Sequence, residues 1–348
     1  MKTQPETFAT VPMQWVGPMR LNGKLVSGEL SAPLATYESP LWPSTNRGAR
    51  VSMACDGIHV SVAQDLMARS ILLEAPSAAA AVEATNAIVS RKGELAAVVG
   101  TTTNHGEFSD LHWQLVGNLI FLRIEMQTGD ASGHNMVTGA ADAVMTWLLE
   151  QYPALTHVSV SGNYCTDKKP SAVNGILGRG KYVVAEMVIP QQLCQKLLRA
   201  SPESIASLNT KKNLIGTSLA GGVRSANAHF ANMLLGFYLA TGQDAANIIE
   251  GSQGYTYADV RDEALHFSVT LPNVIVGSVG NGKDLPFVEE NLARLGCRED
   301  RPTGDNGRRL AAIAGAVVLC GELSLLAAQT NPGELMKAHR KLERNHHE

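Results

Sequence analysis

The most apolar segment of this chain runs from Leu310 to Ala328, contains one acidic residue, Glu322, and is interrupted by glycines. A segment of this length is either a membrane span or the central helix of a folded domain. The charge and the glycines favour a helix buried in a protein core, which we predict over residues 306–330. At 348 residues the chain is long enough to enclose such a helix in a conventional core.

The amino-acid composition argues against nucleic acid, membranes and metal ions as binding partners. The 29 Lys and Arg residues are balanced by 32 Asp and Glu residues, so the chain has no overall basic field with which to hold nucleic acid or an anionic membrane. Its five cysteines are scattered and include no Cys-x-x-Cys pair, which argues against a zinc site and for a reducing compartment. The N-terminal residues are polar and lack the apolar stretch of a secretory signal. We therefore expect a cytoplasmic protein that binds no metal, nucleic acid or membrane.

Changes in the hydrophobic pattern predict two domains of an α+β fold. Ser77 is a suitable N-cap for a helix that ends near Ser90. The next segments are predicted as two strands, a helix and a strand, over 94–100, 119–127, 133–152 and 156–161. We place a small α+β, ferredoxin-like domain at 71–159, inserted into a large, mainly helical domain formed by 1–70 and 160–330. Residues 225–249 are predicted as one long helix, and 331–348 as a C-terminal flap.

A loop that follows the last of these strands concentrates charge. Residues 161–170 read Ser-Gly-Asn-Tyr-Cys-Thr-Asp-Lys-Lys-Pro and place two ammonium groups beside one carboxylate. A Lys-Lys pair is often only a solvated surface feature. It can equally hold a substrate carboxylate with one cation and aim the other at a developing oxyanion, and loops after strands often carry function.

Two glycine-bearing segments can approach an anion. Residues 277–284 nearly fit the phosphate-binding pattern G-x-x-x-x-G-K-[ST], but Asp284 replaces the hydroxyl residue that a nucleotide-triphosphate loop needs for Mg²⁺. The remaining interpretations are a backbone turn beside a dinucleotide pyrophosphate and an ordinary structural turn. Residues 129–135 lie between a predicted strand and helix, where backbone donors can face an anion or form a plain helix start. The Rossmann pattern G-x-G-x-x-G is not met.

Together these segments resemble the class I catalytic domain of the 3-hydroxy-3-methylglutaryl-CoA (HMG-CoA) reductases, from about Val16 to His339. The segments that carry the resemblance occur in the family's order. They are Ser44-Thr45-Asn46-Arg47-Gly48, Gly129-Asp130-Ala131-Ser132-Gly133-His134-Asn135-Met136, Ser161 to Pro170, Lys212-Asn213-Leu214-Ile215-Gly216, Asn227-Ala228-His229-Phe230-Ala231-Asn232, Gly242-Gln243-Asp244-Ala245-Ala246 and Gly321-Glu322-Leu323-Ser324-Leu325.

The resemblance implies a four-electron reduction of (S)-HMG-CoA to (R)-mevalonate and CoA that uses two NAD(P)H, by a homodimer or higher homo-oligomer. It also implies a catalytic set. Lys168 would stabilise the thioester-derived oxyanion, and Asp244 would orient Lys168 and Glu38. Glu38 would deliver a proton to the mevaldehyde oxygen, and His339 would protonate the leaving CoA thiolate. Without the resemblance, Asp244 would be a helix cap and His339 a surface histidine.

The same resemblance assigns substrate and cofactor contacts. Residues matching the family's substrate-binding positions are Ser44, Asn46, Arg47, Arg50, Arg69, Ser161, Asn163, Asp167, Lys169, Lys212, His229 and Asn232. Residues matching its cofactor-binding positions are Thr103, Asn104, Asp130, Ser132, Gly133, His134, Asn135, Met136, Gly277, Gly280 and Gly282.

This chain departs from the family pattern at the cofactor. The family's loop has three consecutive glycines followed by Thr, whereas Asn281 and Lys283 intervene here. Thr103-Asn104 stands where many members have a Ser-Arg pair, and losing that Arg weakens a preference for NADPH over NADH. We predict NADPH, with NADH as the alternative. Other functions left open are a catalytically silent CoA-binding homologue, the same enzyme working oxidatively in mevalonate breakdown, and a P-loop-type NTPase.

Overall fold

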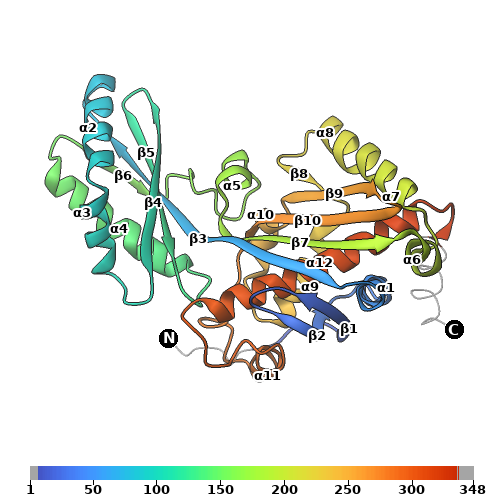
Figure 1. Ribbon diagram of the computed structural model, residues 1–348. Helices are drawn as coiled ribbons and strands as arrows, with labels where there is room; N and C mark the ends of the chain where they lie inside the picture. Colours follow the sequence, from blue (N-terminus) through green and yellow to red (C-terminus); the bar gives the residue numbers. More distant parts are fainter. Residues whose placement is uncertain (1–6, 335, 337–348) are drawn as a thin grey trace.

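A computed structural model describes residues 7–334 and 336 of the chain. Its two sheets share one long strand, β3 (Ile58–Glu74), which crosses from one half of the molecule to the other (Figure 1). Residues 59–66 of β3 pair with a strand of the large sheet, and residues 67–74 pair with strands of the small sheet. The two halves are therefore joined by continuous hydrogen-bonded backbone.

The large sheet is mixed and has the strand order β2-β1-β3-β7-β10-β9-β8. The pairs β1–β3 and β8–β9 are parallel, and the other neighbours are antiparallel. The strands other than β3 are β1 (Met13–Asn22), β2 (Ser27–Ala35), β7 (Gly180–Pro190), β8 (Ser225–Ala226), β9 (Gly254–Arg261) and β10 (Ala264–Val274).

The central helix of this half is α12 (Asp305–Gln329), which packs against α1 (Leu41–Ala54), α9 (Phe230–Ala240) and β7. It is long and apolar enough to cross a membrane, but 94% of its most apolar stretch is buried inside the protein. The prediction of a core helix here is confirmed. Its contact with α1 is close, because a Cβ on Gly48 would collide with the backbone of Cys320.

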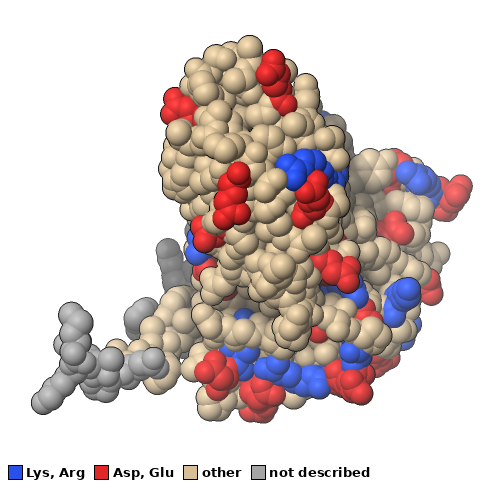
Figure 2. Space-filling model, turned by 90° about the vertical axis from the view of Figure 1, so that its left-hand side faces the viewer, with Lys and Arg blue, Asp and Glu red and all other residues tan. Residues whose placement is uncertain are grey.

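The small sheet adds β4 (Glu107–Val116), β5 (Leu119–Gln127) and β6 (Thr156–Val160) to β3, and it packs against α2 (Ala78–Ser90), α3 (Lys92–Gly100) and α4 (His134–Gln151). The predicted cap is present, since Ser77 Oγ accepts a hydrogen bond from Ala80 N at 3.2 Å. The face of the molecule in Figure 2 shows acidic and basic side chains interspersed on a largely uncharged surface.

The predicted strand at 94–100 is wrong, because this segment is helix α3. Leu95 and Val99 are both buried, and their i, i+4 spacing places them on one helix face against the small core. β4, which follows, was not predicted. Its pairing with β5 is irregular between Phe108 and Asp110, which interrupts the alternation of buried and exposed residues.

The prediction of a mainly helical large domain is also wrong, since the large sheet occupies it. The predicted helix at 225–249 is divided into β8, α9, η3 (Ala245–Asn247) and α10 (Ile248–Gly251). Gly242 follows α9 with a left-handed φ of 64°, and its Cα faces the backbone of Gly282 too closely for a side chain. The chain turns there instead of continuing the helix.

The remaining helices connect these elements: α5 (Ala172–Leu177), α6 (Gln191–Leu193), η1 (Cys194–Leu198), α7 (Pro202–Leu208), η2 (Asn209–Gly216), α8 (Thr217–Leu219) and α11 (Pro286–Arg294). Buried apolar side chains form two clusters, one around α12 and one between the small sheet and α2–α4. The predicted domain boundaries remain a proposal. Most of the predicted flap at 331–348, including His339, lies outside the described residues.

Candidate active site

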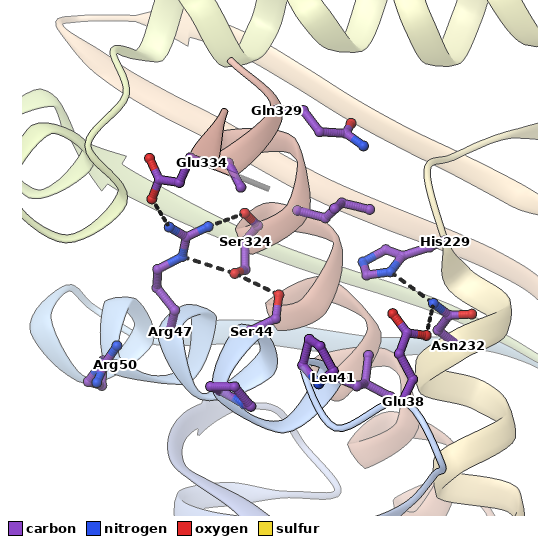
Figure 3. A pocket seen from close by; sticks show the side chains of 14 residues that line it. Glu38, Leu41, Ser44, Arg47, Arg50, His229, Asn232, Ser324, Gln329 and Glu334 are labelled. Atoms are coloured by element: carbon purple, nitrogen blue, oxygen red, sulfur yellow. Dashed lines mark hydrogen bonds and ion pairs between the residues drawn. The ribbon is translucent and has the colours of Figure 1, made fainter. Parts of the chain in front are cut away.

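Six of the predicted site residues line one pocket of about 400 Å³. It is formed by the loop after β2, helix α1, the start of α9 and the C-terminal half of α12 (Figure 3). These residues are Glu38, Ser44, Arg47, Arg50, His229 and Asn232. They are separated by up to two hundred positions in the chain, so the fold, rather than local sequence, brings them together.

Glu38 faces the first turn of α9 in this pocket. Its Oε2 accepts a hydrogen bond from Asn232 Nδ2 at 3.0 Å, and His229 Nδ1 lies 3.5 Å from the same Asn232 nitrogen. The other ring nitrogen of His229 is 3.0 Å from the carbonyl oxygen of Gly321 on α12. The arrangement places a carboxyl group, an amide and an imidazole side by side, as substrate recognition and proton transfer require.

Buried Glu322 on α12 holds the start of α9 in place. Its carboxylate accepts hydrogen bonds from the backbone N–H groups of Ala228 at 2.6 Å and His229 at 3.1 Å, and from Thr256 Oγ1 at 2.8 Å. A fully buried carboxylate needs such partners. The one charge within the apolar run therefore fixes the backbone that carries His229.

Arg47 joins α1 to the end of α12 at the other side of the pocket. Its Nε donates to Ser324 Oγ at 3.0 Å, and its Nη1 lies 3.3 Å from Glu334 Oε1. Burial lowers the pKa of Arg47, while Glu334 opposes that change. Asn46, predicted as a CoA contact, instead accepts a hydrogen bond from Gly17 N at 2.8 Å and so ties α1 to β1.

The loop between β6 and α5 carries the second group of predicted residues. Lys168 Nζ lies 2.6 Å from Asp244 Oδ2. The hydrogen bond that the Lys168 ammonium donates to Asp244 raises the pKa of Lys168 against the effect of partial burial. Burial alone would raise the pKa of Asp244, but the hydrogen bonds from Lys168 and from Ala246 N outweigh burial and lower this pKa. Both side chains are therefore charged at neutral pH. Asp244 also caps η3, as the simpler interpretation expected.

Asp167 lies among three cationic or imidazole groups. Its carboxylate is 3.0 Å from Arg179 Nη1, 3.5 Å from Arg69 Nη1 and 3.8 Å from His134 Nε2. Burial and the nearby Arg179 lower the pKa of His134 to about 4, so this imidazole is neutral at physiological pH. Lys169 Nζ donates to the carbonyl oxygen of Asp167 at 3.1 Å.

The remaining predicted substrate residues lie at the edges of these two groups. Ser161 Oγ accepts a hydrogen bond from Asn163 N at 3.3 Å and lies 3.6 Å from Cys165 Sγ. Lys212 is on η2, where burial lowers its pKa and the charge of Glu322 opposes the change. The negative charge of Glu322 therefore acts on Lys212 as well as on the start of α9.

The two predicted cofactor segments lie against each other. Ala131 and Val279 form an isolated parallel bridge, and Ser278 N donates to Asp130 O at 2.8 Å. A Cβ on Gly277 would collide with Ser132 N and come within 2.7 Å of Ala131 C. The N-cap of α4 is Gly133, which has no side chain to satisfy the first N–H groups of the helix. Glycine backbone beside an uncapped helix start fits a dinucleotide pyrophosphate.

Asp130 has a structural contact in the same region. Its carboxylate accepts hydrogen bonds from Gly304 N at 3.0 Å and Gly307 N at 2.8 Å and thereby caps α12.

The other predicted cofactor residues lie on α4 and on the loop before β4. Asn135 and Met136 belong to the first turn of α4, and Thr103 Oγ1 accepts a hydrogen bond from His105 N at 3.0 Å. Asn104 lines a cavity of about 250 Å³ together with Asp65, Gly129 and Arg308. Arg308 was not predicted.

The P-loop alternative is contradicted by the position of Lys283. Its ammonium donates to the carbonyl oxygen of Gly242, inside the protein, rather than lying over a glycine loop where phosphates would bind. Burial and the nearby Arg298 lower the pKa of Lys283 to about 8. Among residues 7–334 and 336, no group of three or more His, Cys, Asp or Glu side chains could hold a metal ion.

Comparisons with known proteins agree on one family. The sequence model of the family described as hydroxymethylglutaryl-coenzyme A reductase matches residues 7–344. The 3-hydroxy-3-methylglutaryl-coenzyme A reductase of Aeropyrum pernix is 44% identical over 336 residues, which are 96% of this chain and 79% of that protein. The protein of that name from Pyrococcus abyssi is 42% identical over 337 residues, 96% of this chain and 82% of that one.

Solved structures agree with the fold. The class II 3-hydroxy-3-methylglutaryl-CoA reductase of Streptococcus pneumoniae, bound to NADPH in open conformations, matches with a TM-score of 0.74 at 20% identity. The match covers 95% of this chain and 88% of that one. At this identity the likeness establishes a shared fold of mixed α and β structure.

Several residues of the site were missed from sequence: Arg179, Asn247, Glu250, Ser324, Gln329 and Glu334, in addition to Arg308. Ser324 was part of a segment that carried the resemblance, but no role was assigned to it. Arg179 and Glu250 are fully buried charges, and only a known fold shows that they face each other.

Proposed function

The chain belongs to the hydroxymethylglutaryl-coenzyme A reductase family, and from that premise we propose how its residues carry out the family's reaction. The protein is an oxidoreductase of the mevalonate pathway, an NAD(P)H-dependent reductase of HMG-CoA. The reaction reduces (S)-HMG-CoA to (R)-mevalonate and CoA with two NAD(P)H. The observation that carries the assignment of its active site is the ion pair between Lys168 and Asp244 at 2.6 Å.

Lys168 stabilises the negative charge that forms on the substrate's carbonyl oxygen. Hydride addition to a thioester gives a tetrahedral oxyanion, and a pre-positioned cation lowers its energy more than that of the neutral carbonyl. Asp244 supports this role in two ways, because it raises the pKa of Lys168 and fixes its Nζ by a short ion pair. The nicotinamide cofactor supplies the hydride when bound.

Glu38 delivers the proton to the aldehyde oxygen, and Asn232 orients the Glu38 carboxyl group through their 3.0 Å hydrogen bond. His229 and Asn232 hold the acid portion of the substrate together with the groups around Asp167. Arg47 and Arg50 bind the CoA portion from the opposite side of the same pocket. His339 protonates the CoA thiolate, whose ordinary pKa of about 8.5 makes it reactive enough to add back.

The cofactor lies along the paired segments 129–136 and 277–282. The backbone of Gly277, Gly280 and Gly282 and the start of α4 hold its pyrophosphate. We propose NADPH as the preferred form, with Arg308 near Asn104 as a cation for the 2′-phosphate. Arg308 already contacts Asp305 at 2.7 Å and Asp65 at 3.8 Å, so a phosphate must compete with two carboxylates. A higher kcat/KM with NADH in side-by-side assays would overturn this preference.

The finer classification is also a proposal. We assign the chain to class I, which is supported by the class I-like segments that occur in the family's order along the chain and by an identity of only 20% with the class II enzyme of S. pneumoniae. We further propose a cytoplasmic homodimer that works in the biosynthetic direction. Exposed apolar side chains on η2 and α8 support the association of two copies.

One assay tests the whole reaction. The purified protein is mixed with HMG-CoA, and the absorbance of NADPH or NADH is followed while free thiol is titrated. We expect two cofactor equivalents to be oxidised for each thioester, with one thiol released. Binding of HMG-CoA without oxidation of either cofactor would show a catalytically silent homologue. Faster turnover of mevalonate, CoA and oxidised cofactor than of HMG-CoA would favour the degradative direction.

A further inference from the structure

The loop that carries Lys168 has an unfavourable backbone shape. Asn163, Thr166 and Lys168 all have left-handed φ values, 58°, 43° and 55°. Residues with a Cβ avoid this region unless surrounding contacts hold them there. The loop therefore depends on groups outside it to keep the Lys168 side chain aimed at Asp244.

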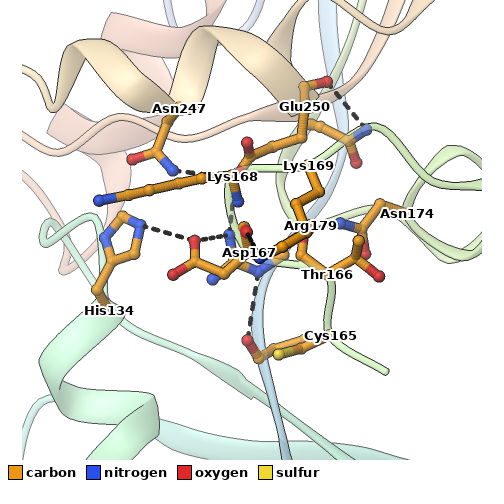
Figure 4. A network of polar contacts seen from close by, with 12 residues as sticks. His134, Cys165, Thr166, Asp167, Lys168, Lys169, Asn174, Arg179, Asn247 and Glu250 are labelled. Carbon is orange, nitrogen blue, oxygen red and sulfur yellow. Dashed lines mark hydrogen bonds and ion pairs between the residues drawn. The ribbon is translucent and has the colours of Figure 1, made fainter. Parts of the chain in front are cut away.

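Two fully buried charges, Arg179 and Glu250, supply such contacts (Figure 4). Glu250 Oε1 accepts the backbone N–H of Lys168 at 3.2 Å and lies 2.9 Å from Arg179 Nη1. The same Arg179 nitrogen lies 3.0 Å from Asp167 Oδ1. Asn247 Nδ2 donates to Glu250 Oε1 at 2.9 Å. Arg179 and Glu250 thus hold two consecutive residues of the loop. Arg179 binds the side chain of Asp167, and Glu250 binds the backbone N–H of Lys168.

Glu250 and Asp244 lie close together in the sequence, so the contact of Glu250 with the loop is connected to the proposed catalytic pair of Lys168 and Asp244. Asp244 begins η3 and Glu250 lies on α10, which follows directly. This short segment therefore holds Lys168 at both ends, since Glu250 binds its backbone N–H and Asp244 binds its Nζ. A shift of either contact moves the ammonium relative to the substrate.

We propose, building on the function proposed above, that Glu250 and Arg179 are positioning residues that fix the Lys168 ammonium against Asp244. They contact neither substrate nor cofactor and act through the loop. Burial raises the pKa of Glu250, while Arg179 and the hydrogen bonds to the carboxylate counter that change. The carboxylate and guanidinium thus need each other, because removing one leaves an uncompensated buried charge.

The test uses the whole 348-residue chain and its variant Glu250→Gln, which keeps the shape and one acceptor oxygen but removes the charge. We expect kcat to fall by about 10- to 100-fold, the range for a small displacement of a catalytic group, while KM for HMG-CoA changes by less than about 3-fold. We also expect the alkaline limb of the kcat–pH profile to move to lower pH, because loss of the Glu250 charge and a loosened contact with Asp244 both lower the pKa of Lys168.

Three further variants separate positioning from general destabilisation. Arg309→Met is the matched control, since Arg309 donates to the carbonyl oxygens of Leu295 at 2.8 Å and Leu25 at 2.9 Å, away from this loop. It should lower the melting temperature without moving the alkaline limb. Arg179→Lys keeps the charge and should recover more activity than Arg179→Met. If Glu250→Gln does not fold, the comparison of the two Arg179 variants decides the question.

A double-variant comparison gives the sharpest result. If Glu250 acts through Lys168, Glu250→Gln should have little additional effect on single-turnover rates in a Lys168→Ala background. Equal losses in both backgrounds, or an unchanged kcat and pH profile for Glu250→Gln in an active protein, would overturn the inference. A wild-type protein that oxidises no cofactor would instead refute the proposed function, so the two failures are distinguishable.

Discussion

At the scale of single residues, the assignment of Lys168 makes the strongest prediction. Lys168→Ala should lower kcat by about 100- to 1,000-fold or more, the loss typical of removing a group that stabilises an oxyanion. The dissociation constant for HMG-CoA should change far less, because the ammonium acts mainly in the transition state. Steady-state kinetics and isothermal titration measure the two effects. A loss confined to binding would move Lys168 from catalysis to substrate recognition.

Asp244→Asn tests the electrostatic part of the same pair. Asp244 raises the pKa of Lys168, so the neutral amide should let that pKa fall. The protonated ammonium is then lost at lower pH, and the alkaline limb of the kcat–pH profile should move to lower pH. The remaining activity should be highest under more acidic conditions than in the wild type. An unchanged alkaline limb would mean that another group controls it.

The residues that sequence identified are those embedded in recognisable local segments. Lys168 and Asp244 were predicted as partners only through the resemblance, and the structure places them in direct contact. Glu250 and Arg179 could not be found this way, since they are isolated charges more than seventy positions apart whose meeting depends on the fold. Asn46 shows that a match to a family position can also mislead. It matched a binding position, yet its side chain bonds the backbone of β1.

At the scale of elements, the close contact between the two glycine segments predicts the effect of one added methyl group. In Gly277→Ala the Cβ would collide with Ser132 N and push the 277–282 loop away from the start of α4. We expect KM for the nicotinamide cofactor to rise by about 10-fold or more, since displaced backbone donors no longer match the pyrophosphate. KM for HMG-CoA should be affected less. Initial-rate kinetics with each substrate varied measure both.

Gly139→Ala, within α4, is the control for that prediction. A Cβ at Gly139 meets nothing within 4 Å, and alanine favours a helix over glycine by about 1 kcal/mol. Thermal unfolding should show equal or greater stability, with unchanged kinetics. If Gly277→Ala also left the cofactor KM unchanged, the 277–282 loop would not be part of the cofactor site.

Elements with strong local signals were predicted well, and those defined by distant partners were not. The α2 cap at Ser77 and the strand β5 were found from sequence, because a hydroxyl cap and an apolar alternation are local features. The large sheet was missed in part. The glycine- and proline-bearing residues 1–50 predicted loops with short strands, one of them at 23–34, so β2 was found and β1 was not. The 225–249 region was read as one helix because its apolar residues continue through Gly242, where the backbone reverses.

At the scale of the whole molecule, one surface of the chain exposes several apolar side chains that nothing within the described part of the chain covers. Ile215 and Leu219, on η2 and α8, are 59% and 88% exposed, and Val223 follows them at 42%. Lys212, a predicted substrate residue, lies on the same η2. Burial of this surface against a second copy would therefore order a part of the active site as well as remove apolar area from water.

Association of two copies and binding of HMG-CoA should therefore be linked. Light scattering of the wild-type protein should give at least twice the mass of one chain, and the double variant Ile215→Glu, Leu219→Glu should give a single chain, because buried like charges oppose the interface. KM for HMG-CoA should rise in this variant through displacement of Lys212. Val116→Glu, at a 63% exposed apolar position on β4, should change neither mass nor kinetics. A wild-type protein that is active as a single chain would show that the η2–α8 surface has another purpose, and that Lys212 needs no partner to reach the substrate.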